Sequence, residues 1–394
     1  MKNKAIKYRL YPTEEQDVMF AKTFGCCRKI YNLMLSDKIE SYKNTGKFAT
    51  VTPAKYKEEY PYLKEVDSLA LANKQLDLQK ALRSCFSKTR KKQNGFPKFK
   101  SAKHSRKSYT TNNQHGTVSV LDNGIKLPKI GVVKAVIHRE PGRDWTLKSV
   151  TVTQESDSKY YASVLFEYAE PENAYTPDIS NAIGLDYASD GLFVDSNGNI
   201  GSNHKYYRES QKKLAKAQRK LSRMLEQNIS EYRTVGKKRY PIYKRPLEEC
   251  RNIQKQKITV AKIQRHIANQ RTDNLHKIST EIANQYDVVC VENLNMRSMA
   301  NNGFGNGKAT LDNGYGKFLS MLEYKLSERN KYLVKVDKWY PSSQICHSCG
   351  VIHPEMKDLR IRLLKCDCGL MIGRDQNAAI NILHEGLRML SETA

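Results

Sequence analysis

Three acidic residues stand where apolar segments of the chain end. Asp186 follows the apolar run 183–185, Glu292 follows the apolar run 288–291, and Asp375 begins the last amphipathic segment. Strand C-termini and helix N-termini converge at one edge of an α/β sheet, so we expect the three carboxylates to lie together. They would repel one another without a cation between them. Mg²⁺ or Mn²⁺ takes such oxygen ligands and shares them with a substrate phosphate.

Two ions held in this way stabilise the attacking and leaving oxygens of a phosphodiester. The sequence therefore predicts a metal-dependent nuclease in which Asp186, Glu292 and Asp375 are the catalytic and metal-binding residues. Taken singly, each acid is better explained as a solvated end of its element, and Asp375 also suits the positive end of a helix dipole. Asp190 and Asp195 remain alternatives to Asp186, although Asp190 is typical of a turn and Asp195 of the start of a hairpin loop.

Four of the nine cysteines form two close pairs near the C-terminus. Cys346 and Cys349 are separated by two residues, and Cys366 and Cys368 by one; each pair is followed by Gly. Four thiolates in two pairs match the tetrahedral coordination of Zn²⁺, and a closed four-thiolate site is structural, not catalytic. A redox pair is the alternative for these cysteines, and one of two histidines could replace a thiolate: His347 or His353.

The composition points to a polyanionic partner. The chain of 394 residues carries 67 Lys and Arg against 41 Asp and Glu, a formal net charge of +26. Such an excess displaces counterions from phosphates, so nucleic acid is the favoured partner and an anionic membrane surface the weaker alternative. The length is typical of two or three domains.

The remaining features favour a cytoplasmic protein. Five cysteines outside the pairs are scattered, which is unlike a secreted disulfide framework and indicates a reducing compartment. No apolar run approaches the ~20 residues of a membrane span. Residues 1–13 are typical of a strand and a turn, not of a signal peptide.

The first part of the chain combines strands with two helices. Residues 4–10 alternate like a strand, and Thr13 with Gln16 predicts a capping box for a helix over 18–42. A second helix is expected over 69–92. Short alternating runs separated by Gly and Pro then predict five strands: 117–121, 124–127, 132–138, 147–153 and 160–168. We interpret residues 1–172 as a small β-barrel with a helical insertion at about 13–92.

An α/β pattern follows the linker expected at 170–177. The expected strands are 182–186, 191–195, 287–292 and 332–336. Helices are expected at 205–285, 315–331 and 375–390. A Gly- and Asn-rich loop is expected at 301–316.

The long segment 205–285 is predicted to be basic and helical, with an interruption near Gly236 and 241–246. Lys and Arg outnumber Asp and Glu about threefold in it. Its tyrosines are expected to pack the helices more often than to stack on bases. The residues proposed for contact with a nucleic-acid backbone are Lys98, Lys100, Arg106, Lys212, Lys213, Lys216, Arg219, Lys220 and Arg223.

Taken in order, these motifs resemble the TnpB (OrfB) family, the RNA-guided nucleases of small insertion sequences that are related to type V CRISPR effectors. The resemblance covers nearly the whole chain. The segments 184–186, 291–294 and 374–379 match the three RuvC motifs of the family. The segment 339–346 resembles the entry to its zinc ribbon, and 94–100 resembles its N-terminal half.

The resemblance implies an α/β RNase H-like (RuvC) nuclease domain with an inserted zinc ribbon. It also implies a wedge-like N-terminal barrel with a helical recognition insert. The nuclease domain would comprise 181–345 and the C-terminal helix 370–394, with the ribbon at 346–369. The expected partners are a guide RNA from the end of the transposable element and a double-stranded DNA target next to a short motif. We expect a monomer with one RNA.

Three positions depart from the family pattern: Ala188 stands where Gly is common, Gly373 where Asp is common, and the second cysteine pair lacks one residue. None of them removes a carboxylate. Two other functions use the same fold: an RNA-guided DNA-binding repressor without cleavage, and a transposase or junction resolvase without guide RNA.

Overall fold

The chain divides into an N-terminal unit, Met1–Pro171, and a C-terminal unit, Glu172–Ala394, and each unit has hydrophobic clusters of its own. The computed structural model describes residues 1–87, 95–169, 175–202, 204–299 and 312–393. Most of the loop expected at 301–316, much of the expected linker, and the expected helix end at 88–92 lie outside these residues. Among the helices described, none is long and apolar enough to cross a membrane.

The N-terminal unit is built on a seven-stranded antiparallel sheet in the order β2-β6-β7-β1-β5-β4-β3. The sequence predicts a barrel, in which the first and last strands of the sheet would pair. In the structure, β2 and β3 are the two edge strands of this sheet. The alternation of buried and half-buried residues in β7, from Tyr160 to Tyr168, shows why the period-two pattern identified this strand. The strands are β1 (Lys2–Tyr11), β2 (Lys107–Asn112), β3 (Ser119–Leu121), β4 (Gly124–Leu127), β5 (Gly131–Val136), β6 (Thr146–Gln154) and β7 (Tyr160–Tyr168).

Two helices pack on this sheet, α1 (Glu14–Thr45) and α2 (Ser68–Phe86). Short 3-10 turns η1 (Pro53–Tyr56) and η2 (Pro61–Lys64) join them. The predicted capping box is confirmed, because Gln16 N donates to Thr13 Oγ1 and Thr13 N donates to Gln16 Oε1. Strand β2 was not predicted, since its polar sequence Lys107–Asn112 has no apolar alternation.

The C-terminal unit contains a mixed sheet in the order β13-β12-β8-β9. Its strands are β8 (Ala182–Tyr187), β9 (Phe193–Asp195), β12 (Val288–Glu292) and β13 (Tyr332–Val336). Strand β12 runs parallel to both β8 and β13, so these three strands end at the same edge. Strand β9 returns antiparallel to β8.

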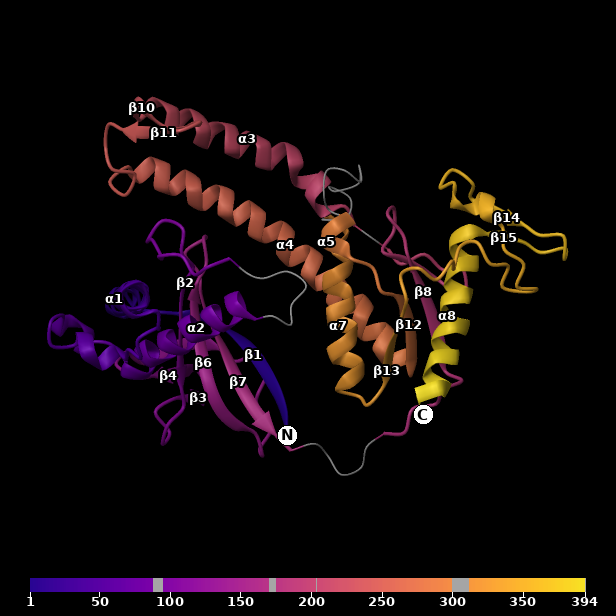
Figure 1. The fold of residues 1–394 in the computed structure, drawn as a ribbon, viewed down its shortest axis with the longest axis horizontal. Helices are drawn as coiled ribbons and strands as arrows, with labels where there is room; N and C mark the ends of the chain where they lie inside the picture. The colour runs from indigo at the N-terminus through magenta and orange to yellow at the C-terminus, as the bar shows by residue number, and fades with distance from the viewer. Residues whose placement is uncertain (88–94, 170–174, 203, 300–311, 394) are drawn as a thin grey trace. The chain divides into compact units, whose positions relative to one another are not determined.

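Helices cover both faces of this sheet, which explains the continuous apolar runs of its strands. Val289 and Val291 of β12 point to one face, where they join a core with α7 (Tyr315–Ser327) and the end of α4 (Arg251–Gln285). Val288 and Cys290 point to the opposite face and pack with Ile382 of α8 (Arg374–Thr393). Figure 1 shows α7 and α8 flanking the strands.

Two glycines let α8 approach the sheet closely. A Cβ on Gly184 in β8 would lie 2.0 Å from the Ala379 carbonyl oxygen, and a Cβ on Gly386 would lie 2.3 Å from Cys290 Sγ. Neither the Ala379 backbone nor the buried Cys290 thiol can move far enough to accommodate a methyl group, so glycine is required at both positions. This packing places the first turn of α8 beside the end of β8.

The basic segment folds as two antiparallel helices, α3 (Tyr206–Gln227) and α4, joined by an unpredicted two-stranded ribbon (Figure 1). The ribbon consists of β10 (Ile229–Val235) and β11 (Lys238–Tyr243). The predicted interruption of the helix is therefore a β-hairpin. Gly236 has a φ of 61° in its turn, and Pro241 is tolerated because a two-stranded ribbon has only edges.

Candidate functional site

The three predicted carboxylates line one cavity of about 830 Å³ in the C-terminal unit. Asp186 comes from the end of β8, Glu292 from the last position of β12, and Asp375 from the first turn of α8. Parallel pairing aligns the ends of β8 and β12. Gly184 and Gly386 let α8 pack closely on the sheet, which brings Asp375 to the same place. The cavity also has a basic and aromatic wall, formed by Lys338, Trp339, Arg362 and Arg374.

Burial and mutual repulsion disfavour negative charge at this site. Burial raises the pKa of Asp186 well above its usual range, and the charges of Asp375 and Glu292 raise it further. Burial, with a smaller contribution from Asp337, raises the pKa of Glu292 to about 7. Both carboxyls therefore gain from a proton or from a cation bound between them.

Asp375 is held by two arginines. Its Oδ1 accepts hydrogen bonds from Arg374 Nε and Nη2 at 3.1 and 3.0 Å, and its Oδ2 lies 3.6 Å from Arg362 Nη1. The carboxylates of Asp375, Asp186 and Glu292 share the cavity, but their oxygens do not all lie within 4.8 Å of one another. The arrangement is a shared anionic pocket in which arginines offset part of the charge.

The two alternatives to Asp186 have other surroundings. Buried Asp195 closes the hairpin turn after β9, because its carboxylate accepts hydrogen bonds from Asn197 N, Asn199 N and Asn199 Nδ2. Asp190 also lines the cavity, but its side chain is 92% exposed and lies 3.8 Å from Lys205 Nζ. These contacts fit a turn residue in each case.

Sequence reasoning missed several residues around the pocket. Asn313 is fully buried, and its Nδ2 donates to the carbonyls of Ala188 at 2.9 Å and Gly191 at 2.7 Å, which anchors the loop after Asp186. Tyr315 is buried beside it, and its pKa is raised first by burial and then by Asp186 and Glu292. Gly314, with a φ of 69°, precedes α7. This helix start was the one sequence signal that could have pointed to Asn313 and Tyr315.

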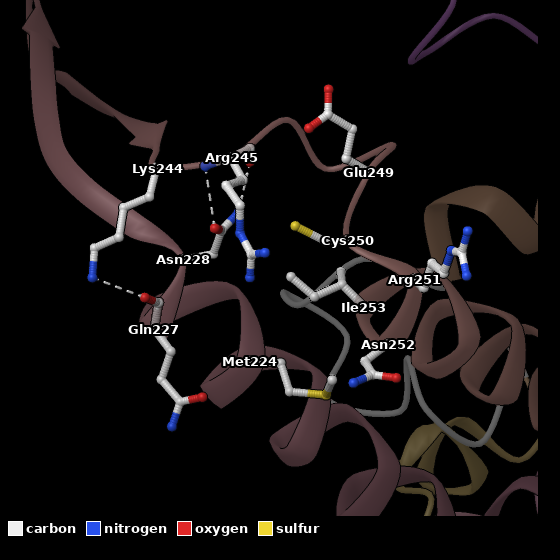
Figure 2. A pocket seen from close by; sticks show the side chains of 10 residues that line it. All are labelled: Met224, Gln227, Asn228, Lys244, Arg245, Glu249, Cys250, Arg251, Asn252 and Ile253. Carbon is white, nitrogen blue, oxygen red and sulfur yellow. Dashed lines mark hydrogen bonds between the residues drawn. The ribbon is translucent and has the colours of Figure 1, made fainter.

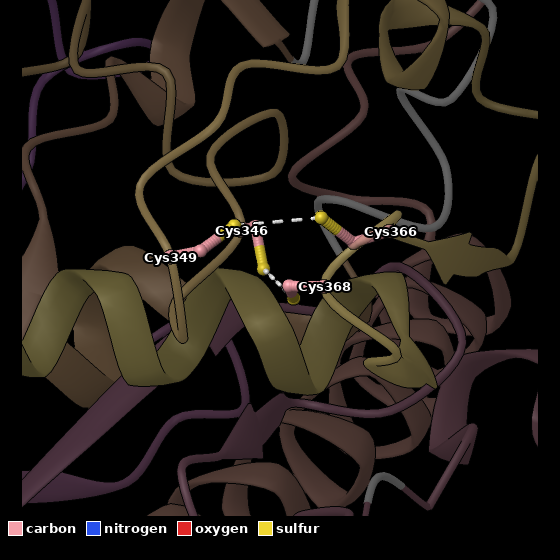
Figure 3. A group of neighbouring side chains, drawn as sticks. All are labelled: Cys346, Cys349, Cys366 and Cys368. Carbon is pink, nitrogen blue, oxygen red and sulfur yellow. Dashed lines mark hydrogen bonds between the residues drawn. The ribbon is translucent and has the colours of Figure 1, made fainter.

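The four paired cysteines converge as predicted (Figure 3). All four sulfurs lie within 4.8 Å of one another. Cys346 Sγ is 3.7 Å from Cys368 Sγ, and Cys349 Sγ is 3.5 Å from Cys366 Sγ. A tetrahedron with Zn–S bonds of about 2.3 Å has S···S edges of roughly 3.8 Å, so the arrangement can hold Zn²⁺.

The surroundings of Cys346 favour its thiolate form. Burial alone would raise the pKa of Cys346, but hydrogen bonds from the backbone N–H groups of Cys349 and Ser348, together with those of the Cys349 and Cys368 thiols, lower it to about 6. Thiolates are the metal-binding form of cysteine. The short hairpin of β14 (Leu363–Lys365) and β15 (Met371–Gly373) presents the second pair.

The histidines near the cysteines have other partners. His347 Nδ1 lies 3.0 Å from Asn377 Oδ1, and His353 Nδ1 lies 3.1 Å from Glu355 Oε1. Asn377 Nδ2 and Asn381 Nδ2 both donate to the Ile345 carbonyl, at 2.7 and 2.6 Å. Helix α8 therefore carries Asp375 and also anchors the segment that leads into the cysteine cluster.

The basic residues proposed for backbone contact have different surroundings. On α3, Lys212, Lys213, Lys216, Arg219, Lys220 and Arg223 are exposed, while Leu214 and Ala217 pack toward α4. Lys98 and Arg106 are also exposed. Lys100 is different, because its Nζ lies 3.7 Å from the Tyr31 ring centroid and burial lowers its pKa.

Three family models match parts of the chain. A model described as "Probable transposase" covers residues 163–303, and one described as "Cas12f1-like, TNB domain" covers residues 315–382. A "Helix-turn-helix domain" model covers residues 1–47, which here form strand β1 and the single helix α1.

Whole-length relatives and a solved structure agree with these matches. The chain is 31% identical to the "Putative RNA-guided DNA endonuclease" of Streptomyces pristinaespiralis, over 98% of this chain and 89% of the relative. It is 27% identical to the "Putative RNA-guided DNA endonuclease InsQ" of Escherichia coli, over 98% and 93%. The chain in a Cas12f1-sgRNA-target DNA complex shares the fold, with a TM-score of 0.56 at 13% identity, over 97% of this chain and 98% of that one. By these likenesses and by its ordered motifs, the chain belongs to the TnpB (OrfB) family.

Proposed function

We propose that this protein is an RNA-guided endonuclease that hydrolyses target DNA in the pocket of Asp186, Glu292 and Asp375. The observation that carries the proposal is the meeting of three carboxylates, from β8, β12 and α8, in one cavity of a chain with net charge +26. Guidance by RNA is supported by the names of the whole-length relatives.

The donor set of the pocket fits hard divalent cations. Asp186, Glu292 and Asp375 would hold Mg²⁺ or Mn²⁺, since these ions prefer carboxylate oxygens. The raised pKa values of Asp186 and Glu292, which arise first from burial and then from neighbouring carboxylates, support this, because a bound cation would offset both effects. When bound, a pair of such ions would stabilise the charge that develops on a phosphodiester during hydrolysis.

The chain's own residues complete this role. Arg374 and Arg362 offset the charge of Asp375 and lie where a phosphate of the substrate strand could be held. Lys338 and Trp339 provide a cation and an exposed ring on the cavity wall, with Lys338 Nζ 4.5 Å from the ring centroid. Asn313 keeps the loop after Asp186 in place.

We extend the proposal to the domains. The C-terminal unit would be the RuvC-like nuclease domain, with 181–345 and the helix at 370–394 enclosing a zinc ribbon at 346–369. The sulfur geometry supports a structural Zn²⁺ held by Cys346, Cys349, Cys366 and Cys368. The N-terminal unit would be the wedge with its helical recognition insert. Asp186→Asn in the full RNA-loaded protein tests the proposal.

With Mg²⁺ present, Asp186→Asn should lower the rate of target-DNA cleavage by at least about a thousandfold, because it removes a metal ligand. DNA affinity should change by less than about threefold, since RNA pairing reads the target. Gel assays of cleavage and binding measure the two effects.

Asp190→Asn is the matched control, because Asp190 lines the same cavity with an exposed side chain. Its cleavage rate should stay close to that of the parent. Equal cleavage by Asp186→Asn and the parent would contradict the assigned site. Stable binding without cleavage by the parent, in Mg²⁺ and in Mn²⁺, would favour a repressor. Cleavage without RNA would favour a resolvase or transposase.

A further inference from the structure

The ribbon β10–β11 exposes an unusual amount of aromatic and basic surface. The exposed fractions are 52% for Tyr232, 54% for Val235, 50% for Tyr240 and 40% for Ile242. Between residues 229 and 243 the chain has four Lys or Arg and one Glu. Strand alternation places Val235, Tyr240 and Ile242 on one face, and the charged residues of this face are Arg233, Lys238 and Glu231.

The opposite face of the ribbon has a similar character. The Arg239 guanidinium lies 5.9 Å from the centre of the Tyr232 ring on that face. Isolated two-stranded ribbons are marginally stable in water, and β10 and β11 form a sheet of their own. A ribbon with aromatic and basic residues on both faces is therefore suited to a stable, negatively charged partner with flat apolar groups.

A cavity of about 570 Å³ lies at the base of the ribbon, between the end of α3 and the start of α4, and its charged lining residues are Lys244, Arg245, Arg251 and one acid, Glu249. Asn228 closes this base, because its Nδ2 donates to the Arg245 carbonyl at 2.9 Å and its Oδ1 accepts from Arg245 N at 3.3 Å. Lys244 Nζ donates to the Gln227 carbonyl at 3.1 Å (Figure 2).

Two arginine side chains of this cavity are available for a ligand. Within the described part of the chain, neither Arg245 nor Arg251 forms an ion pair with a carboxylate. Apolar side chains of Met224 and Ile253 line the other side. The volume lies within the range of small-molecule sites, and a mixture of guanidinium groups and apolar wall suits a nucleotide.

RNA with unpaired bases fits this surface better than duplex DNA does. Aromatic side chains stack on bases that are splayed out of a helix, as in RNA loops and single strands, while the bases of a duplex already stack on one another. Helix α4 has 35 residues and so places the ribbon about 50 Å from its other end, next to β12. A structured RNA can span that distance before any target DNA is bound.

We propose that the β10–β11 ribbon and the cavity at its base form a binding site for unpaired nucleotides of the protein's RNA. Tyr232 and Tyr240 stack on bases, and Arg245 and Arg251 hold backbone phosphates at the cavity. The proposal rests on the proposed function only in that the protein carries an RNA.

Crosslinking gives the first test. The full chain is expressed together with the DNA that flanks its gene, and the RNA that copurifies is crosslinked by ultraviolet light. Mass spectrometry should locate crosslinked nucleotides in peptides from residues 229–253. Crosslinks confined to other peptides would overturn the assignment of the ribbon. Absence of any copurifying RNA would instead contradict the proposed function.

Binding measurements with the same RNA, transcribed and labelled, give the second test. Tyr232→Ala with Tyr240→Ala should weaken binding by at least about thirtyfold, whereas the double Tyr→Phe variant should retain it, because only the ring stacks. Arg245→Gln with Arg251→Gln should reduce the slope of log affinity against log salt by about 1.4, as expected for two lost phosphate contacts.

Lys277→Gln with Lys335→Gln is the matched control. It removes two exposed positive charges that already pair with Asp273 and Glu323. It should leave both the affinity and the salt slope close to the parent values. The assignment is overturned if the ribbon variants bind RNA as the parent does, or if they lose affinity only for a 30-base-pair DNA duplex. Circular dichroism checks that every variant keeps its helices.

Discussion

At the scale of single residues, the pocket buries carboxyl groups that would be more stable as charged groups in water. Asp186 and Glu292 are both buried enough for their pKa values to rise, and the arginines beside Asp375 offset part of the charge. Such burial of charge costs stability in the metal-free protein, and a cation bound between the carboxyls would recover that cost.

Glu292→Gln makes this cost measurable. The pKa of Glu292 rises from 4.5 to about 7 on folding, so its contribution to stability is present below pH 4.5 and is lost as the pH rises to 7. At pH 8 in EDTA the variant should be more stable by about 1–2 kcal/mol, allowing for partial exposure. Thermal denaturation at pH 4 and pH 8 measures this difference, which should vanish at pH 4.

Glu226→Gln, on the exposed surface of α3, is the control for loss of one negative charge. It should not reproduce the stabilisation at pH 8. Adding Mg²⁺ should stabilise the parent more than Glu292→Gln. A variant that is less stable than the parent at pH 8 in EDTA would argue against the strained carboxyl.

The cysteine cluster makes a second prediction at this scale. The protein should contain about one zinc per chain, and Cys346→Ser should lower that content, because three thiolates hold Zn²⁺ less tightly than four. Metal analysis of the purified protein measures it. Cys85→Ser removes a thiol outside the cluster and should keep the full zinc content. An undiminished zinc content in Cys346→Ser would contradict the four-thiolate site.

At the scale of elements, helix α8 connects the two candidate metal sites. Its first turn carries Asp375, Asn377 and Asn381 anchor the segment before Cys346, and Gly184 and Gly386 let it contact the sheet. The position of Asp375 relative to Asp186 therefore depends on how closely α8 packs on β8.

Gly184→Ala should displace α8. The new methyl group would meet the Ala379 carbonyl at 2.0 Å, so the protein should lose about 1–3 kcal/mol of stability and most of its cleavage activity. Denaturant unfolding and a cleavage assay measure the two losses.

Gly25→Ala serves as the comparison, because Gly25 lies within α1 and a Cβ there meets nothing within 4 Å. That variant should gain about 0.5–1 kcal/mol from its higher helix propensity. Equal stability of Gly184→Ala and the parent would show that α8 can move without cost, contrary to the close packing described for it.

At the scale of the whole molecule, the net charge of +26 is the dominant property. Exposed Lys and Arg side chains on α3 contribute to it, while the acidic pocket is a small negative region within a basic chain. Charge of this kind supplies affinity for any nucleic acid, whatever its sequence.

The RNA-free protein should therefore bind duplex DNA with a strong dependence on salt. Its affinity for a labelled 30-base-pair duplex should fall by about a thousandfold or more between 50 and 200 mM salt, as expected for at least six phosphate contacts. Fluorescence anisotropy at several salt concentrations measures the slope. A fall of less than about tenfold would mean that the charge is not directed to nucleic acid.

The sequence by itself determined the local elements, because their signals lie in neighbouring residues. Strands β4, β7 and β13 were predicted with the ends that the structure has, since short runs rich in apolar residues mark them in the sequence. The capping box of Thr13 and Gln16 was predicted for the same reason. The four cysteines were identified as one cluster because two close pairs followed by Gly are a pattern of neighbouring residues.

The tertiary structure alone decided what depends on contacts between distant segments. The β10–β11 ribbon was missed because its strands have no buried face, and β2 because its sequence is mostly polar although one face of it is buried against the core. The anchoring role of Asn313 depends on Ala188 and Gly191, more than a hundred residues away. The meeting of Asp186, Glu292 and Asp375 was expected from strand ends, but the pocket itself arises from the packing of α8 on β8. Such packing is set by shape across the core, which neighbouring residues do not encode.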